Sequence, residues 1–212
     1  MAKNEKGPHE SSDTFLYKFA RFVLQVFSFL VYPVCAHDKD RLDRNAPYLI
    51  VANHQSMMDP LLIAVISRRH QIHFIGKSTL RKNAVFNWVL DHLQMIPVSR
   101  GLTDMRAMRD ALKVLQEGRV VGIFPEGTRR RDSMMQNMGS GVGLIALRAQ
   151  VPVIPIYFAQ RPRPLRVTHL YVGDELPYED IRAMDINKES CELFTYRVRD
   201  IIYRMKETAE KQ

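Results

Sequence analysis

Short apolar runs alternate with segments of helical periodicity along most of the chain. The apolar runs predict buried strands at residues 48–52, 72–75, 95–98, 120–124, 153–158 and 165–172. Helical spacing predicts helices at residues 60–69, 104–118, 141–150 and 188–206, with a further helix around Trp88. This alternation predicts an α/β fold with a mostly parallel or mixed sheet flanked by helices.

Two helix starts carry clear sequence signals. Asp59-Pro60 is typical of an N-cap followed by proline at the first helical position, and Thr103 is expected to cap the helix that stops at Gly118. The first signal places Asn53, His54 and Asp59 at a junction between a strand and a helix.

The apolar stretch at residues 14–34 differs from the strands in its length. Lys18, Arg21 and Gln25 interrupt it at spacings of three and four, which puts them on one helical face. Two cations in the first half argue against a simple membrane span and favour an interfacial helix, with a charged-edged core helix as the alternative. We expect a polar tail (1–13), this membrane-associating helix (14–34) and an α/β domain (35–212).

Composition says more about possible partners and the cellular compartment than about the reaction. The 212-residue chain has a formal charge of +8, which attracts polyanions such as lipid headgroups, phosphorylated carriers or nucleic acid. It carries no recognition-helix, zinc-finger or RNP-like motif, so we expect no nucleic-acid partner. Cys35 and Cys191 are far apart and show no ligand spacing, so neither a disulfide framework nor a metal site is predicted, and a reducing, cytoplasmic setting is expected.

His54 and Asp59 form the first candidate for chemistry. Histidine exchanges a proton near neutral pH, and a carboxylate held against one ring nitrogen fixes the tautomer and stabilises the cation. Such a dyad would activate a hydroxyl on the substrate. Alternatively, Asp59 only caps its helix and His54 only hydrogen-bonds in a loop.

Phe124-Pro125-Glu126-Gly127-Thr128-Arg129 is the second candidate. Glycine after a strand lets the backbone approach a ligand, while a hydroxyl and a guanidinium bind phosphate oxygens. The alternative is a strand-ending turn with solvated arginines.

Four blocks together resemble the glycerolipid acyltransferase family, whose bacterial 1-acyl-glycerol-3-phosphate acyltransferases are the most similar members. The blocks are NHQSMMD (53–59), IPVSR (96–100), FPEGTR (124–129) and VPVIPI (151–156). They occur in the family's order, and the resemblance covers roughly residues 48–158. The chain departs from the family at Thr79, where relatives often carry glutamate, and at Ser140, where many carry lysine before the following glycine.

The resemblance implies a reaction and a set of residues. In it, His54 is the general base, Asp59 orients His54, and the acceptor hydroxyl attacks the acyl thioester without an acyl-enzyme. Residues implied to bind substrate are Asn53, Lys77, Arg100, Glu126, Gly127, Thr128 and Arg129. The donor would be acyl-CoA or acyl-carrier protein, the acceptor a lysophospholipid, and no cofactor or metal is expected.

The resemblance also implies a cellular location and leaves other activities open. The reaction would make phosphatidate for phospholipid biosynthesis at the cytoplasmic face of the cell membrane, with the enzyme peripheral or monotopic. An acyltransferase for another lysolipid, or a thioester or lipid hydrolase using the same His-Asp pair, remains open. Arg161, Arg163 and Arg166 would face anionic lipid or coenzyme A, or form a solvated loop.

Overall fold

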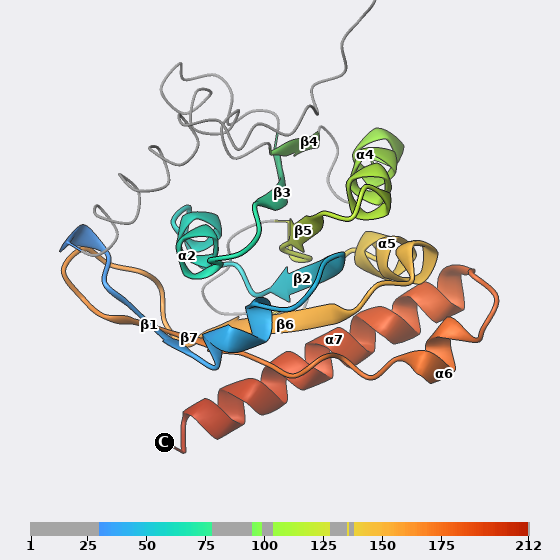
Figure 1. The fold of residues 1–212 in the computed structure, drawn as a ribbon. Helices are drawn as coiled ribbons and strands as arrows, with labels where there is room; N and C mark the ends of the chain where they lie inside the picture. The colour runs from blue at the N-terminus through green and yellow to red at the C-terminus, as the bar shows by residue number, and fades with distance from the viewer. Residues whose placement is uncertain (1–29, 78–94, 99–103, 128–134, 136–137, 212) are drawn as a thin grey trace, which may run out of the picture.

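The computed structural model describes residues 30–77, 95–98, 104–127, 135 and 138–211. Within them, seven strands form one sheet in the order β1-β7-β6-β2-β5-β3-β4 (Figure 1). These strands are β1 (Val34–His37), β2 (Tyr48–Ala52), β3 (Ile72–Lys77), β4 (Ile96–Val98), β5 (Val120–Ile123), β6 (Val153–Phe158) and β7 (Thr168–Val172). The predicted helix around Trp88 and residues 1–29 lie outside the described residues.

The sheet is mostly parallel, which confirms the predicted fold class. Every neighbouring pair is parallel except β6 and β7, which are antiparallel. Strands β2 to β6 therefore run in one direction and end at the same edge, whereas β1 and β7 run the other way. Open α/β sheets bind ligands at the carboxyl edge of their strands.

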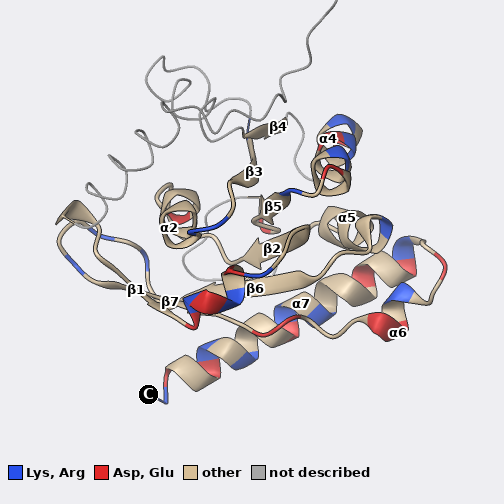
Figure 2. Ribbon diagram, viewed as in Figure 1, with Lys and Arg blue, Asp and Glu red and all other residues tan. Residues whose placement is uncertain are grey.

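Helices cover both faces of the sheet (Figure 1). They are α2 (Asp59–Ile66), α4 (Met105–Gln116), α5 (Gly141–Ala149), α6 (Glu179–Arg182) and α7 (Lys188–Ala209), with a 3-10 helix at Lys39–Leu42. One apolar core joins α4, α5 and α7 to one face, and a second joins α2 and Leu42 to the other. Charged residues recur along the length of α7 (Figure 2), while its buried Phe194, Val198 and Ile202 belong to the first core.

The predicted membrane-associating helix does not extend to Val34. Leu30 and Val31 are helical, Tyr32 is a bend, and Val34 already belongs to β1, which the sequence analysis missed. Pro33 explains the break, because proline disfavours a helical residue before it. The carbonyl of Pro33 instead accepts the N–H of Thr168, 2.8 Å away, at the start of β7.

Both predicted caps are wrong. The N-cap of α4 is Asp104, whose side chain accepts from the backbone N–H groups of Arg106 and Ala107. Asp59 is the first helical residue of α2 rather than its N-cap, and Met58 precedes it without a side-chain cap. Because the carboxylate of Asp59 does not cap α2, it can accept hydrogen bonds from other groups.

Gly143 sets the distance between α5 and α7. A Cβ built on Gly143 would lie 2.8 Å from the Cα of Cys191 in α7 and closer still to its carbonyl oxygen. Both neighbours are backbone atoms, which cannot swing away as a flexible side chain does.

Replacing Gly143 with alanine should therefore lower the free energy of unfolding by about 1–3 kcal/mol, as overpacking typically does. Urea denaturation followed by circular dichroism measures it. Gly118→Ala is the comparison, since Gly118 has a φ of 77° but open space around it, so only backbone strain of about 1–2 kcal/mol applies. A Gly143→Ala protein as stable as wild type would contradict the close approach.

Candidate active site

Two motif loops meet at the carboxyl edge of the sheet. Strands β2 and β5 are parallel neighbours, with Val51 opposite Ile123. The segment 53–58 follows β2 and the segment 124–127 follows β5, so both leave the sheet at the same edge. Two blocks about 70 residues apart in sequence thus form one site.

His54 and Asp59 make the predicted contact. The Nδ1 atom of His54 lies 2.8 Å from Oδ2 of Asp59, and the two side chains are 17% and 0% exposed. A carboxylate accepts the proton on Nδ1, so Nε2 becomes the basic nitrogen of the ring. The geometry is that of a histidine prepared to take a proton from a hydroxyl.

Backbone donors fix the carboxylate that orients His54. Oδ2 of Asp59 accepts from the N–H of Gln55 at 2.6 Å and from the N–H of Ser56 at 2.7 Å. The loop therefore folds back around Asp59, and the buried carboxylate is stabilised by hydrogen bonds to its charged form. This arrangement favours the dyad over the capping alternative.

Phe124 supports the other side of the histidine ring. Its ring stacks on His54 with centroids 4.3 Å apart and an interplanar angle of 29°, and it also stacks on Phe74. Phe124 directly follows β5, so a residue of the FPEGTR block packs against the histidine of the NHQSMMD block. His54 is held between a carboxylate and an aromatic ring, which restricts its rotation.

Asn53 joins β2 to β6. Its amide nitrogen donates to the carbonyl of Phe158 at 3.1 Å, and its amide oxygen accepts the N–H of the same residue at 2.8 Å. Its side chain is fully buried. The sequence analysis expected Asn53 to bind substrate, but this geometry favours a positioning role in which Asn53 fixes the start of the His54 loop.

Glu126 and Gly127 shape the loop after β5. Oε1 of the buried Glu126 accepts the N–H of Met135 at 3.0 Å, which ties the two ends of the segment 126–135 together. Gly127 has a φ of 61° and its N–H donates to the carbonyl of Phe124 at 3.1 Å, forming a turn. Glu126 therefore holds the loop, and Gly127 supplies the left-handed conformation that the turn requires.

The remaining predicted residues divide between the exposed surface and the part not described. Lys77 ends β3 at the same edge and is exposed. Arg100, Thr128 and Arg129 lie outside the described residues. Their expected contact with the acceptor phosphate stays a prediction from the sequence.

Comparison with known proteins decides the family. A family model described as Acyltransferase matches residues 33–159, which is more than half of the chain. The chain belongs to the acyltransferase family. This acyltransferase also shares its fold with the 1-acyl-sn-glycerophosphate (LPA) acyltransferase PlsC from Thermotoga maritima, at a TM-score of 0.67 and 23% identity, covering 92% of this chain and 82% of that one.

Curated relatives of the acyltransferase carry the name 1-acyl-sn-glycerol-3-phosphate acyltransferase. The Bacillus subtilis protein is 29% identical over 140 residues, which are 66% of this chain and 69% of that protein. The Streptococcus pneumoniae protein is 25% identical over 183 residues, covering 82% of this chain and 67% of that protein. The chloroplastic BAT2 of Brassica napus is 30% identical, but the chain spans only 43% of its length.

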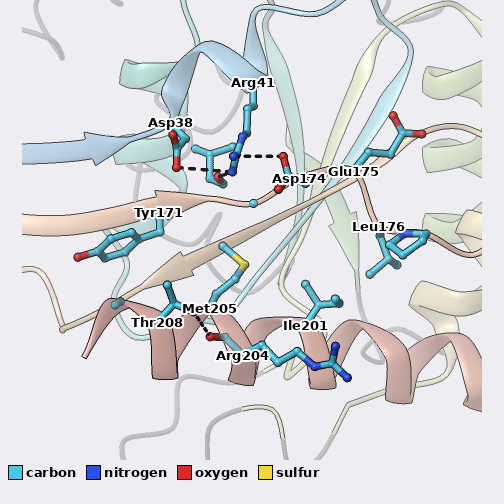
Figure 3. A pocket seen from close by; sticks show the side chains of 14 residues that line it. Asp38, Arg41, Tyr171, Asp174, Glu175, Leu176, Ile201, Arg204, Met205 and Thr208 are labelled. Carbon is cyan, nitrogen blue, oxygen red and sulfur yellow. Dashed lines mark hydrogen bonds and ion pairs between the residues drawn. The ribbon is translucent and has the colours of Figure 1, made fainter. Parts of the chain in front are cut away.

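A pocket of about 300 Å³ lies elsewhere on the acyltransferase (Figure 3). Tyr171 from β7, Leu176 and the end of α7, including Met205, line it. None of the predicted site residues lines this pocket. We therefore assign it no part in the His54 site.

Sequence reasoning missed several residues that build the acyltransferase site. Gln55 and Ser56 act through backbone N–H groups, which no side-chain pattern reveals, and Gln55 also donates its side-chain amide to the carbonyl of Phe158 at 2.7 Å. Phe124 belongs to the FPEGTR block, but the sequence analysis assigned it only to the strand at residues 120–124. Its place in that block, two residues before Glu126, is the sequence signal that could have identified it.

Proposed function

We propose that this acyltransferase transfers a fatty acyl group from a thioester donor to the free hydroxyl of 1-acyl-glycerol 3-phosphate, giving phosphatidate. The observation that carries the proposal is the His54–Asp59 hydrogen bond at a sheet edge shared with residues 124–127 of the FPEGTR block. The names of the curated relatives support the choice of acceptor.

The dyad performs general base catalysis in this proposal. Nε2 of His54 takes the proton from the acceptor hydroxyl while its oxygen attacks the thioester carbonyl carbon. The tetrahedral intermediate then collapses, the carbon–sulfur bond breaks, and the thiolate takes the proton back from the imidazolium. Asp59 keeps Nδ1 protonated throughout and stabilises the cation. No residue is acylated.

Cationic side chains recognise the substrates in this scheme. Lys77, Arg100 and Arg129, with the Thr128 hydroxyl, would bind the glycerol phosphate, as the family resemblance implies. The acyl donor is acyl-CoA or acyl-carrier protein, and both present a thioester.

A hydrolase with the same dyad is the second candidate, because water could replace the acceptor hydroxyl. The two activities differ in their need for acceptor. We expect acyl-CoA or acyl-carrier protein to be consumed only when lysophosphatidate is added, as followed by thiol release. Donor consumption at the same rate without acceptor would favour the hydrolase.

Substitution of Arg129 tests phosphate recognition. Arg129→Ala should raise the apparent KM for lysophosphatidate by about tenfold or more, the effect of losing a charge-assisted hydrogen bond of about 1.5–3 kcal/mol. Arg129→Lys should restore the affinity only in part, because lysine keeps the charge and loses the planar fork. Equal changes in KM for donor and acceptor would show that Arg129 does not select the acceptor.

The acyltransferase is proposed to work at a membrane surface, where its acceptor resides. Beside the helical Leu30 and Val31 lies a loop whose Leu165 and Val167 are 78% and 50% exposed, and Leu165 donates its N–H to the carbonyl of Val31 at 2.7 Å. Arg161, Arg163 and Arg166 are exposed in the same loop. Apolar side chains beside arginines suit an interface with anionic lipid.

Among the described residues, none of the helices combines the length and apolar character that crossing a bilayer requires. The structure also indicates where a truncation that tests membrane binding should end. Deleting residues 1–34 would remove Val34 from β1, so deletion of residues 1–29 separates membrane binding from folding more cleanly.

The protein lacking residues 1–29 should bind anionic vesicles less tightly and lose activity on vesicle-embedded acceptor. Its activity on acceptor in detergent should fall much less. Vesicle co-sedimentation measures the binding, and high salt should release the full chain only in part, because buried apolar area is not screened. Deleting only residues 1–13 is the control and should change neither vesicle binding nor activity. A folded protein without residues 1–29 that binds vesicles as tightly as the full chain would contradict this role.

A further inference from the structure

Three metal-ligating side chains meet on strands β1 and β7, away from the dyad. Cys35 and His37 are two residues apart on β1, so their side chains point to the same side of the sheet. Cys35 is opposite His169 in the parallel register with β7. The sequence analysis predicted no metal site, because His169 is 132 residues from His37 along the chain.

Two distances between the donor atoms match a tetrahedral metal site. Nε2 of His37 lies 3.2 Å from Nδ1 of His169, and Sγ of Cys35 lies 3.7 Å from Nε2 of His37. Tetrahedral zinc, with its usual bond lengths, separates two nitrogen ligands by roughly 3.3 Å and a sulfur from a nitrogen by roughly 3.6 Å. All three donor atoms lie within 4.8 Å of one another, so a small rotation of the Cys35 side chain completes the set.

A ring contact restricts His37, and Cys35 remains accessible. The ring of His37 stacks on Tyr171 with centroids 4.3 Å apart and an interplanar angle of 5°. His37 and His169 are half-buried, while Cys35 is exposed and open to an incoming ion. One thiolate and two imidazoles form a borderline-soft donor set that favours zinc over magnesium or calcium.

We propose that Cys35, His37 and His169 bind one zinc ion, with water as the fourth ligand. Binding displaces the proton of the Cys35 thiol, so a thiolate and two neutral imidazoles coordinate the ion. The site is separate from the His54 site. His37 stacks on Tyr171, which packs against the core that includes α7, whereas His54 stacks on Phe124, which belongs to the core that includes α2.

The position of the site indicates what the ion does. Strand β1 is an edge strand of four residues, and it connects residues 30–31, next to the proposed membrane-binding segment, to the sheet. Zinc would link β1 to β7 through side chains in addition to the backbone pairing. The ion would therefore strengthen the attachment of the membrane-facing region to the acyltransferase domain.

Metal binding by the full-length, tag-free protein tests the proposal. The reduced protein is stripped with chelator, and zinc is added in equilibrium dialysis; cobalt(II) is added separately as a spectroscopic probe. We expect one zinc per chain, a thiolate-to-cobalt charge-transfer absorption, and a zinc-dependent rise in Tm. Cys35→Ser should abolish the absorption, and His37→Gln and His169→Gln should each weaken zinc binding by at least about tenfold.

Two variants outside the cluster serve as matched controls. Cys191→Ala removes the other cysteine, which is buried in α7, where burial raises the pKa of its thiol. His70→Gln changes a histidine that bonds to the carbonyl of Arg44. Both should bind one zinc as wild type does. Absence of stoichiometric zinc binding, or binding unchanged in Cys35→Ser and His169→Gln, would overturn the proposal, and neither result bears on acyl transfer.

Discussion

Replacing His54 with alanine is expected to lower kcat for acyl transfer by roughly 10²- to 10⁴-fold, the usual contribution of a general base. Without the imidazole, no group in the dyad can accept the proton of the attacking hydroxyl. Apparent KM values should change little, because His54 acts on the hydroxyl during the reaction rather than on the phosphate. Initial rates with acyl donor and lysophosphatidate measure the effect.

The fold should survive this change, since His54 lies in a loop at the edge of the sheet. Loss of the contact with Phe124 should lower stability only modestly, and thermal unfolding checks this. His70→Gln, which alters a histidine outside the site, is the control and should keep full activity. A loss of activity below tenfold in a folded His54→Ala protein would remove His54 from the role of general base.

Substitution of Asp59 by asparagine should reduce kcat by about 10²- to 10⁴-fold with a smaller effect on stability. Asparagine still offers one oxygen to the N–H groups of Gln55 and Ser56, but its neutral amide cannot stabilise the imidazolium and favours the wrong tautomer of His54. Single-turnover and steady-state rates, compared with the midpoint of urea unfolding, separate the two effects.

Asp59→Ala completes the test of Asp59. It removes the acceptor altogether and leaves two backbone N–H groups without their partner, at a cost of about 1–3 kcal/mol for each buried donor. We therefore expect Asp59→Ala to lose both stability and activity, and Asp59→Asn to lose mainly activity. If Asp59→Asn kept wild-type activity, Asp59 would be a purely structural residue.

Sequence pattern was sufficient for the centre of the sheet. Strands 48–52 and 153–158 were predicted with the observed bounds, because both are continuous apolar runs buried on two faces. Pattern failed at the edge of the sheet, where β1 is short and contains a cysteine and a histidine. Its pairing with β7 depends on residues more than 130 positions away.

The site was predictable in its chemistry and less so in its architecture. The contact between His54 and Asp59 follows from their spacing across a turn, but the donors that fix Asp59 are backbone groups. Asn53 and Glu126 were expected at the substrate, yet their side chains bond to backbone atoms of Phe158 and Met135. Phe158 is 105 residues from Asn53, and the partner of Glu126 is a backbone N–H, so neither contact leaves a side-chain signal in the local sequence.

The most direct test of the proposed function is to identify the product. Full-length protein is incubated with an isotope-labelled acyl donor, either acyl-CoA or acyl-carrier protein, and 1-acyl-glycerol 3-phosphate in detergent, and the lipids are read by mass spectrometry. We predict phosphatidate that carries the labelled chain, one released thiol per product, and almost none of this product with His54→Ala. Labelled free fatty acid without phosphatidate from either donor, or equal phosphatidate from wild type and His54→Ala, would contradict it.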